Sequence, residues 1–418
     1  MASTLDTVVG ALRRVFGLRR PEPLQRVAYL PVAGMMMTQD EAMNVSAVWA
    51  CVRIISEMIA SCEWQIYAPA PGAKRRDRLL DDDRLWLLNT RPNKEMTAIG
   101  FWESMLIQAL AWGSSYAQIQ RGTRTGRPQA LWPLPVDRSR LRRTETGDLV
   151  LETHDAAGVT WRIPYEDVFH VHGPGIDGLM GDNRIARAAR AIAMSAAMQR
   201  AGVDFYSRGA QLAGVLEYPG KVAPATIDQL RQQWEETYAG AGNHYRPLIL
   251  EGGMKFTATT ATASDSSTVE EKRFSVEEIC RWFGVPPHLV QHQGGSSTYG
   301  SIEHASIEFV RGTLRPWAVR LMQECDFKMF GGYYGPVRQS VIDLRPLTMG
   351  DLASRANAYS SLRTAGLFTT NEIRAWEGED SIGPDGDVLL VQSAMVTLDS
   401  VLSGAQQPEN PEPSKEAA

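Results

Sequence analysis

Two helical patterns that enclose a short β-like segment constrain the fold of this chain more than any other feature. Residues 224–240 and 268–284 each repeat apolar side chains at steps of three and four, which is typical of amphipathic helices. Between them, residues 241–267 contain the run RPLIL, a double-glycine turn and the alternating run MKFTATTATAS. We expect two antiparallel helical rods, each about 25 Å long, with a small β insertion at their far tip.

The sequence pattern in the first half of the chain predicts helices that support a region of short strands. Apolar periodicity indicates helices over 44–61 and 97–112, with Asn44 as an N-cap and Thr97 at the start of the second. The period then changes to alternation over 113–173, which predicts a β-meander of about five strands. An Ala- and Arg-rich helix follows over 183–208. The fold class that these patterns predict is α+β.

After two prolines that end the second rod, the sequence predicts a polar loop and then a further long helix. Pro286 and Pro287 cannot continue the preceding rod, and the loop QHQGGSSTYG follows them. The helix starts near Ser301 and contains Gly312 and Pro316. A proline removes the hydrogen bond to the carbonyl four residues earlier and presses on it, and a glycine there has no side chain in the way, so we predict a kink between 312 and 316. The region 348–400 is expected to be mostly helical.

Length and composition predict a soluble protein of two or three domains. The chain has 418 residues, 44% of them hydrophobic, yet no stretch approaches the roughly 18 uninterrupted apolar residues of a membrane span. Residues 1–26 contain five arginines, four of them on a weakly amphipathic stretch that ends at residue 20, and we expect a flexible basic arm that docks on neighbouring subunits. A helix at a membrane surface is the alternative. The Pro/Glu-rich tail 401–418 is expected to be disordered.

Charge and cysteine usage argue against static DNA binding and against a metal centre. The formal net charge is −5, whereas proteins that bind DNA tightly present an excess of Lys and Arg. The four cysteines form no CxxC pair, so we expect buried free thiols in a reducing compartment.

Catalytic motifs are present only as near misses. The frame Gly295–Ser301 resembles a phosphate-binding loop, but serine stands where its lysine should be. His170 and His172 share a strand face but lack further ligands at suitable spacing, so a core or surface pair of histidines is favoured over a metal site. The acidic run 81–83 is expected to be solvated before a helix, with a divalent ion as the alternative. Two function classes remain: a structural assembly protein, and a metal-dependent hydrolase with an unrecognised site.

Nine sequence stretches, in order along the chain, resemble the portal (head–tail connector) proteins of tailed bacteriophages, in the subfamily typical of long-tailed siphophages. Each stretch is weak alone, and their order and spacing make the resemblance specific. They are VSAVWACVRIISEMIASCEWQIY (45–67), RPN (91–93) with Phe101, GSSYAQIQR (113–121), LWPLP (131–135), DVFHVHG (167–173), FYSRGAQLAGVLEYPG (205–220), LILEGGMKF (248–256), EEICRWFGVPPHLV (277–290) and SIEHASIEFVRGTLRPW (301–317).

The resemblance implies a ring, usually of twelve subunits, at one capsid vertex, through which double-stranded DNA is packaged and ejected. It implies a portal fold, with an α/β body called the wing, a two-helix stem, a small β-containing clip at the stem tip, a tunnel loop facing the channel, and a helical crown. The corresponding ranges are 27–220 and 301–345 for the wing, 221–240 and 268–288 for the stem, 241–267 for the clip, 289–300 for the tunnel loop and 346–400 for the crown.

The resemblance also implies partners and places candidate site residues. Terminase and the head–tail adaptor would dock at the clip, and the major capsid protein at the wing, with the subunit in the virion and, during assembly, in the host cytoplasm. No catalytic residue, metal, cofactor or membrane is implied. DNA in transit would meet uncharged polar side chains of the tunnel loop without sequence preference. The stem charges are expected on solvated helix faces with ion pairs between subunits, and channel lining by three basic residues is the alternative. The loop residues are Gln291, His292, Gln293, Ser296, Ser297 and Tyr299, and the stem charges are Lys272, Arg273 and Arg281.

Overall fold

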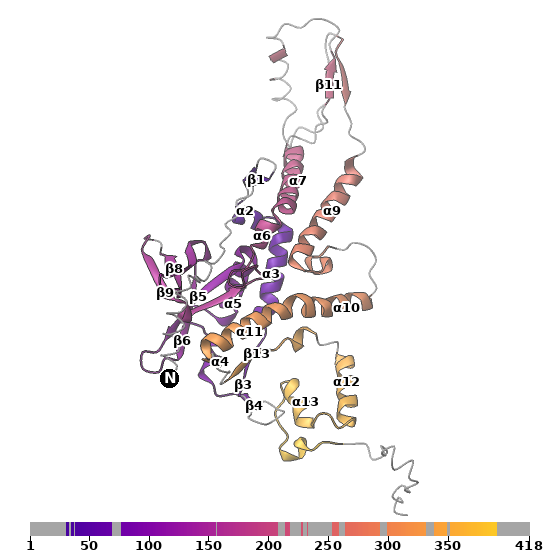
Figure 1. Cartoon of the computed structure of the whole chain (residues 1–418). Helices are drawn as coiled ribbons and strands as arrows, with labels where there is room; N and C mark the ends of the chain where they lie inside the picture. The colour runs from indigo at the N-terminus through magenta and orange to yellow at the C-terminus, as the bar shows by residue number, and fades with distance from the viewer. Residues whose placement is uncertain are drawn as a thin grey trace, which may run out of the picture. The chain divides into compact units, whose positions relative to one another are not determined.

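The protein was analysed as a computed structural model, and it forms two compact units, Met1–Leu347 and Thr348–Ala418 (Figure 1). The first unit combines helices with small antiparallel sheets, which confirms the α+β class. The described residues are 31–32, 35–36, 38–68, 77–155, 157–207, 214–217, 227–228, 232, 253–258, 264–292, 299–331, 338–348 and 352–390.

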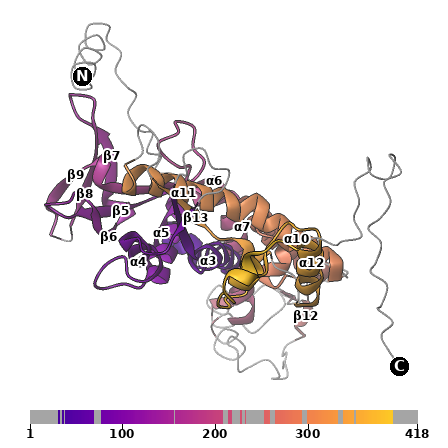
Figure 2. The ribbon, with the colours of Figure 1, turned by 90° about the horizontal axis from the view of Figure 1, so that it is seen from below.

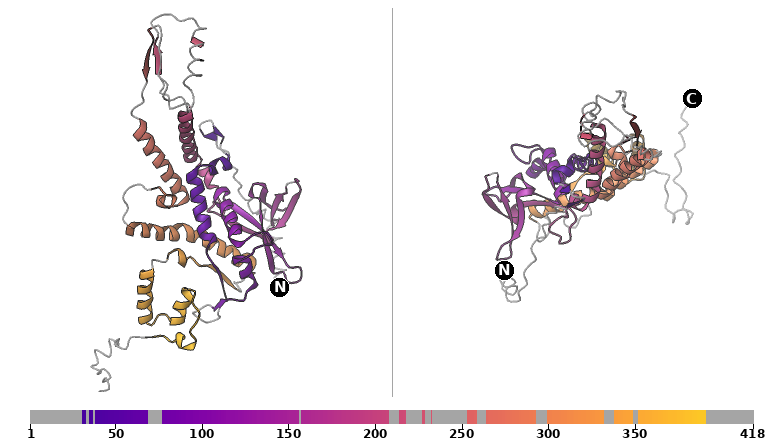
Figure 3. Two further views of the ribbon diagram at one scale, coloured as in Figure 1. Left: turned by 180° about the vertical axis from the view of Figure 1, so that it is seen from behind. Right: turned by 90° about the horizontal axis from the view of Figure 1, so that it is seen from above.

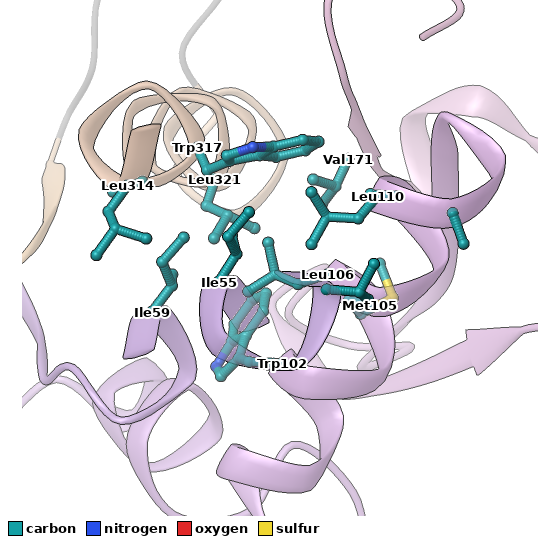
Figure 4. Packing of buried hydrophobic residues seen from close by; sticks show 14 of the residues in the cluster. Ile55, Ile59, Trp102, Met105, Leu106, Leu110, Val171, Leu314, Trp317 and Leu321 are labelled. Atoms are coloured by element: carbon teal, nitrogen blue, oxygen red, sulfur yellow. The ribbon is translucent and has the colours of Figure 1, made fainter. Parts of the chain in front are cut away.

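Three helices, α3 (Ser46–Ala60), α5 (Ala98–Trp112) and α11 (Arg315–Met329), enclose the main hydrophobic core. Ile55 and Ile59 of α3 meet Trp102 and Leu106 of α5, and all four are buried (Figure 4). α11 and the turn before it cover this layer with Leu314, Trp317 and Leu321. Each fully buried side chain of this size contributes roughly 2 kcal/mol, so the core holds these helices together although they lie far apart in sequence.

The ends of the first helices show which sequence signals were correct. α5 begins after Thr97, as predicted, and ends at Gly113, whose φ is +90°. The prediction of Asn44 as an N-cap was wrong. Thr38 forms a capping box that starts a short helix, α2 (Gln39–Met43), and Asn44 ends that helix, while α3 begins after Val45 without a side-chain cap.

The strands between 113 and 173 form two three-stranded sheets, so the prediction of a single meander was wrong. The first sheet has the order β10–β5–β6 and the second the order β7–β8–β9. Pro133 has no N–H to donate, which suits β6 to an edge, and a 3₁₀ turn at Val136–Arg138 then directs the chain into the second sheet. Figure 2 shows the second sheet at the outer end of this unit. The strands are β5 (Ser114–Arg121), β6 (Pro128–Leu134), β7 (Ser139–Arg143), β8 (Leu149–His154), β9 (Thr160–Pro164) and β10 (Val168–His172).

A third small sheet joins the two ends of the first unit. β13 (Gln339–Ile342) pairs with β3 (Trp64–Ala68), which also pairs with β4 (Asp77–Leu79). Val341 lies opposite Gln65 in this register. The pairing holds the segment after α11 against the segment after α3.

Two long helices project from this body and carry a strand pair at their far end (Figure 3). They are α7 (Ala189–Ser207), which follows the short α6 (Arg184–Arg187), and α9 (Ser264–Phe283), and they pack against each other. Beyond them, β11 (Gly214–Glu217) pairs with β12 (Lys255–Ala258). α9 matches the rod predicted at 268–284. Most of the rod predicted at 224–240 lies outside the described residues, and so does the run RPLIL.

The second unit is a pair of helices with an aromatic centre. α12 (Leu352–Thr364) and α13 (Thr370–Trp376) are joined by a short turn, and Thr369 starts α13 with a capping box. The Trp376 ring lies 4.6 Å from the ring centroid of Phe368 and 6.0 Å from that of Tyr359. This unit therefore has its own small packing centre.

Candidate functional site

The candidate site is the junction between α9 and α10 (Tyr299–Phe309), where the sequence predicts a polar loop. α9 ends at Gly284, whose φ is +70°, and Val285 N–H donates to the Cys280 carbonyl over 3.0 Å while Gly284 N–H donates to the Arg281 carbonyl over 3.3 Å. This pair of bonds is a Schellman motif, which requires a left-handed residue and favours glycine. The last helical residue is therefore Phe283, and the chain leaves the helix at Gly284, before the two prolines that were predicted to stop it.

The first loop residues are held by a tight 3₁₀ turn, Pro287–Val290. His292 N–H donates to the Pro287 carbonyl over 3.0 Å, and Gln291 adopts a left-handed φ of 59°, the one positive φ among the described non-glycine residues. Gln291 is exposed, whereas His292 is partly buried, with its Nε2 3.8 Å from Glu277 Oε1. The turn thus directs Gln291 outward at the base of the loop.

The other predicted loop residues are only partly placed. Gln293, Ser296 and Ser297 lie outside the described residues. Tyr299 is the first residue of α10, so the helix begins two residues earlier than the predicted start near Ser301.

A surface cavity of about 510 Å³ lies beside this junction. Its base includes the buried side chains of Cys280, Val285 and Phe309, and Glu277, Arg281 and Glu308 bring charge to its lining. Among the described residues, no group of three or more His, Cys, Asp or Glu side chains could hold a metal ion.

A π-helical turn, Val310–Leu314, lies where the sequence predicts a kink. Arg315 N–H donates to the carbonyl of Val310, five residues back, directly before Pro316, which has no N–H to donate. A Cβ added to Gly312 would meet nothing within 4 Å, so the structure gives no steric reason for glycine at 312. Thr313 of this turn donates its hydroxyl to the Gly284 carbonyl over 2.6 Å. The irregular part of the long helix is therefore bonded to the end of α9.

Arg184 and Arg320 pack on the ring of Trp317 beside the junction of α9 and α10. The guanidinium carbon of Arg184 lies 5.2 Å from the Trp317 ring centroid and that of Arg320 lies 5.4 Å from it. Arg184 also donates to the Phe283 carbonyl at 3.5 Å, at the last residue of α9. Burial, together with the charge of Arg320, lowers the pKa of Arg184 to about 10, so Arg184 stays cationic at neutral pH.

The predicted stem charges lie on exposed positions of α9. Lys272, Arg273 and Arg281 are exposed, and acidic residues alternate with them along the helix. A single chain does not define a channel surface, so their channel-lining role stays a prediction.

A buried polar cluster between β10 and α11 has no counterpart in the sequence predictions. Glu324 of α11 accepts a hydrogen bond from the His170 backbone N–H over 3.0 Å, and Lys328, one turn later, donates to the Tyr165 carbonyl. Burial raises the pKa of Glu324 to about 7, although Lys328 opposes the shift. Burial also lowers the pKa of His170 well below its usual value, so this imidazole is neutral.

His170 is a core residue, whereas His172 on the same strand is only partly buried. Its ring stacks on Tyr116 at 4.7 Å, and Tyr165 Oη lies 3.1 Å from its Nδ1. The carboxylate that reaches His170 is Glu324, which is 154 residues away in sequence and could not be found from local spacing.

The four cysteines are free and buried, as predicted. Cys51 of α3 and Cys280 of α9 have their sulfur atoms 4.0 Å apart. The contact packs the base of α9 against the core helix α3.

The chain matches the family model described as phage portal protein over residues 46–378. It is 29% identical to the portal protein of Enterobacteria phage HK97 over 378 residues, covering 90% of this chain and 87% of that protein. It is 27% identical to the probable portal protein of Streptomyces phage phiC31 over 364 residues, covering 85% of this chain and 78% of that protein.

Solved structures show a similar fold. A chain from the neck of a native gene transfer agent particle, computed with C12 symmetry, has a TM-score of 0.59 at 22% identity and covers 89% of this chain and 99% of its own. The crystal structure of an HK97-family phage portal protein from Corynebacterium diphtheriae has a TM-score of 0.51 at 13% identity, covering 74% of this chain and 96% of its own.

Proposed function

Because the chain belongs to the phage portal protein family, we propose that it is the ring-forming subunit of the channel through which double-stranded DNA is packaged into a capsid and ejected from it. The observation that carries this proposal is the family match over residues 46–378, which includes the helical core, the projecting helices and the long helix. The ring is proposed to contain twelve copies and to occupy one vertex of the virion capsid.

We assign the stem to α7 and α9, because these are the projecting helices that pack together. This assignment differs from the one based on the sequence pattern, which used 221–240 as the first stem helix. The strand pair β11–β12 belongs with the clip, which brings 214–217 into a region first assigned to 241–267. The tunnel loop remains at 289–300, the second part of the wing at 301–345 and the crown at 346–400.

The net charge suits a conduit that DNA passes without adhering. Each chain carries a formal charge of −5, so twelve copies carry about −60, and such a ring repels phosphate on average. The loop base presents Gln291, an uncharged polar side chain that can hydrogen-bond a phosphate without releasing many counterions.

The partners follow from this role. Terminase binds the clip during packaging, in the host cytoplasm, and supplies the energy; the head–tail adaptor replaces it later, and the major capsid protein surrounds the wing. The subunit itself is proposed to have no enzymatic activity. The alternative of a metal-dependent hydrolase gains no support from the matched family. No helix among the described residues has the length and apolar character to span a bilayer.

Native mass spectrometry of the purified protein, with negative-stain images of the same sample, tests the proposal. We expect particles with the mass of twelve 46.2-kDa chains that show a ring with a central hole. A particle that stays monomeric or dimeric at all concentrations, also when capsid protein is present, would contradict the ring.

A further inference from the structure

A second surface depression, of about 430 Å³, lies between α7 and α9, on the helices that project from the body. Glu270, Phe274 and Glu278 follow each other at steps of four along one face of α9. Ala191 and Met194 of α7 form the opposite wall. We call this depression the α7–α9 groove.

The groove combines negative charge with exposed apolar surface. Glu270, Glu271 and Glu278 line it, and none of the described residues that line it is a lysine or an arginine. Among the described residues, no ion pair reaches any of these three carboxylates. Phe274 and Met194 are 58% and 56% exposed, although both are large apolar side chains. A surface of this kind fits a basic segment that also carries apolar side chains.

This chain contains such a segment near its N-terminus. Residues 11–20, ALRRVFGLRR, contain four arginines and no acidic residue, with Val15, Phe16 and Leu18 between the arginine pairs. The described chain resumes at β1 (Pro31–Val32), which contacts α7. The eleven residues from Arg20 to Pro31 can span up to roughly 35 Å when extended, about the length of a helix of this size.

We propose that residues 11–20 bind in the α7–α9 groove of their own chain, with the arginines against Glu270, Glu271 and Glu278 and Phe16 against Phe274 and Met194. Charge complementarity selects this segment, and the contact of β1 with α7 brings the following part of the chain to one of the two helices that form the groove. The segment then holds the first turns of α7 against the middle of α9. The proposal does not depend on the number of subunits in the ring.

Photo-cross-linking of the full-length protein tests the proposal. A genetically encoded benzoylphenylalanine at position 16 should cross-link to peptides that contain Met194 or Phe274. Glu270→Lys with Glu271→Lys should lower the yield by about fivefold or more, and so should an increase in salt from about 50 to about 500 mM. Adding Arg19→Glu and Arg20→Glu to the lysine variant should restore the yield to within about twofold.

Matched controls separate the proposal from general effects of charge. Glu95→Lys with Glu145→Lys changes two exposed carboxylates outside the groove, and its yield should equal that of the unsubstituted groove. Cross-links that map to other elements, or a yield that the groove substitutions leave unchanged, would overturn the proposal. In a mixture of ¹⁵N-labelled and unlabelled chains, cross-links should join peptides of the same isotope, and mixed pairs would overturn the assignment to the same chain.

Discussion

Glu324 is a carboxyl group in the interior of the first unit, and its protonation should make folding depend on pH. Its pKa rises from 4.5 to about 7 on folding because burial disfavours the charged form. A raised acid pKa means that the folded state binds the proton more tightly, so the stability that it contributes is complete below about pH 4.5 and is lost as pH rises through about 7. The shift corresponds to about 3 kcal/mol as an order of magnitude.

Glu324→Gln should flatten this dependence, since glutamine keeps the shape and cannot ionise. Relative to the unchanged protein, the variant should gain up to about 3 kcal/mol in the free energy of unfolding between pH 4.5 and pH 8. Urea unfolding at several pH values measures the difference. Glu308→Gln, at an exposed position of α10, serves as the control. Parallel pH profiles for the unchanged protein and the Glu324 variant would show that the carboxyl group does not titrate in this range.

Gly284 and Gly312 lie near each other in the junction but should respond differently to alanine. Gly284 has a φ of +70°, and an added Cβ would lie 2.8 Å from Thr313 Oγ1, so Gly284→Ala should cost about 1–2 kcal/mol. At Gly312 an added Cβ meets nothing within 4 Å, so Gly312→Ala should be neutral or stabilise by up to about 1 kcal/mol. Thermal unfolding compares the pair, and a larger loss for Gly312→Ala would reverse this reasoning.

The roles of single residues could be predicted where they depend on local sequence. The predictions failed where the role depends on tertiary contacts. The acidic run 81–83 was expected to be solvated. Asp81 and Asp83 are exposed at the start of α4 (Asp83–Asn89), which agrees with this expectation. Asp82 differs: it caps α4, its side chain is 3% exposed, and it forms ion pairs with Arg84 and Arg338. Arg338 follows more than 250 residues later, and no local pattern indicates that pairing.

The sequence predicts a kink in the long helix from Gly312 and Pro316, and the structure has a π turn, Val310–Leu314, at this place. Pro316→Ala restores an N–H that can donate to the Gly312 carbonyl, so the π turn can become regular α-helix. We expect the variant chain to unfold at the same or a higher temperature and to form fewer rings, because the turn fixes Thr313 against Gly284. Ring yield by native mass spectrometry and thermal unfolding check the two parts. Arg315→Ala, at an exposed position of the same helix, is the control, and equal ring yields in both variants would contradict the expectation.

Element types were easier to predict than element partners. Periodicity located α3, α5, α9 and the long helix, because each has one apolar face. It could not show that β10 pairs with β5, since hydrogen-bonded pairing in sheets follows the path of the whole chain. The same limit explains the stem: the pattern at 224–240 suggested a partner for α9, and the projecting helix that packs against α9 in the described part of the chain is α7.

At the scale of the whole molecule, the order of many weak motifs predicted the function, and composition only narrowed the possible classes of function. A net charge of −5 argues against a protein that binds DNA tightly, but it does not separate a structural assembly protein from a hydrolase. The family match favours the assembly protein. The tunnel loop could not be established in the same way. Its role depends on where twelve copies of the loop lie in a ring, which is a property of the assembly.

Gln291 allows the conduit function to be tested through charge. It is exposed at the base of the loop, so Gln291→Arg adds one positive charge per subunit and twelve per proposed ring without altering the core. If the loop faces the channel, the clustered guanidinium groups should neutralise phosphates, and purified rings should retain DNA at about 50 mM salt and release it at about 200 mM. Gln291→Glu, at the same position, should retain none. Filter binding measures retention, and in a packaging assay the arginine ring should load less DNA than the unchanged ring because tight contacts slow translocation. If the arginine and glutamate rings bind and package DNA equally, the side chain at 291 lies away from the channel, and the tunnel loop must be sought elsewhere in the chain.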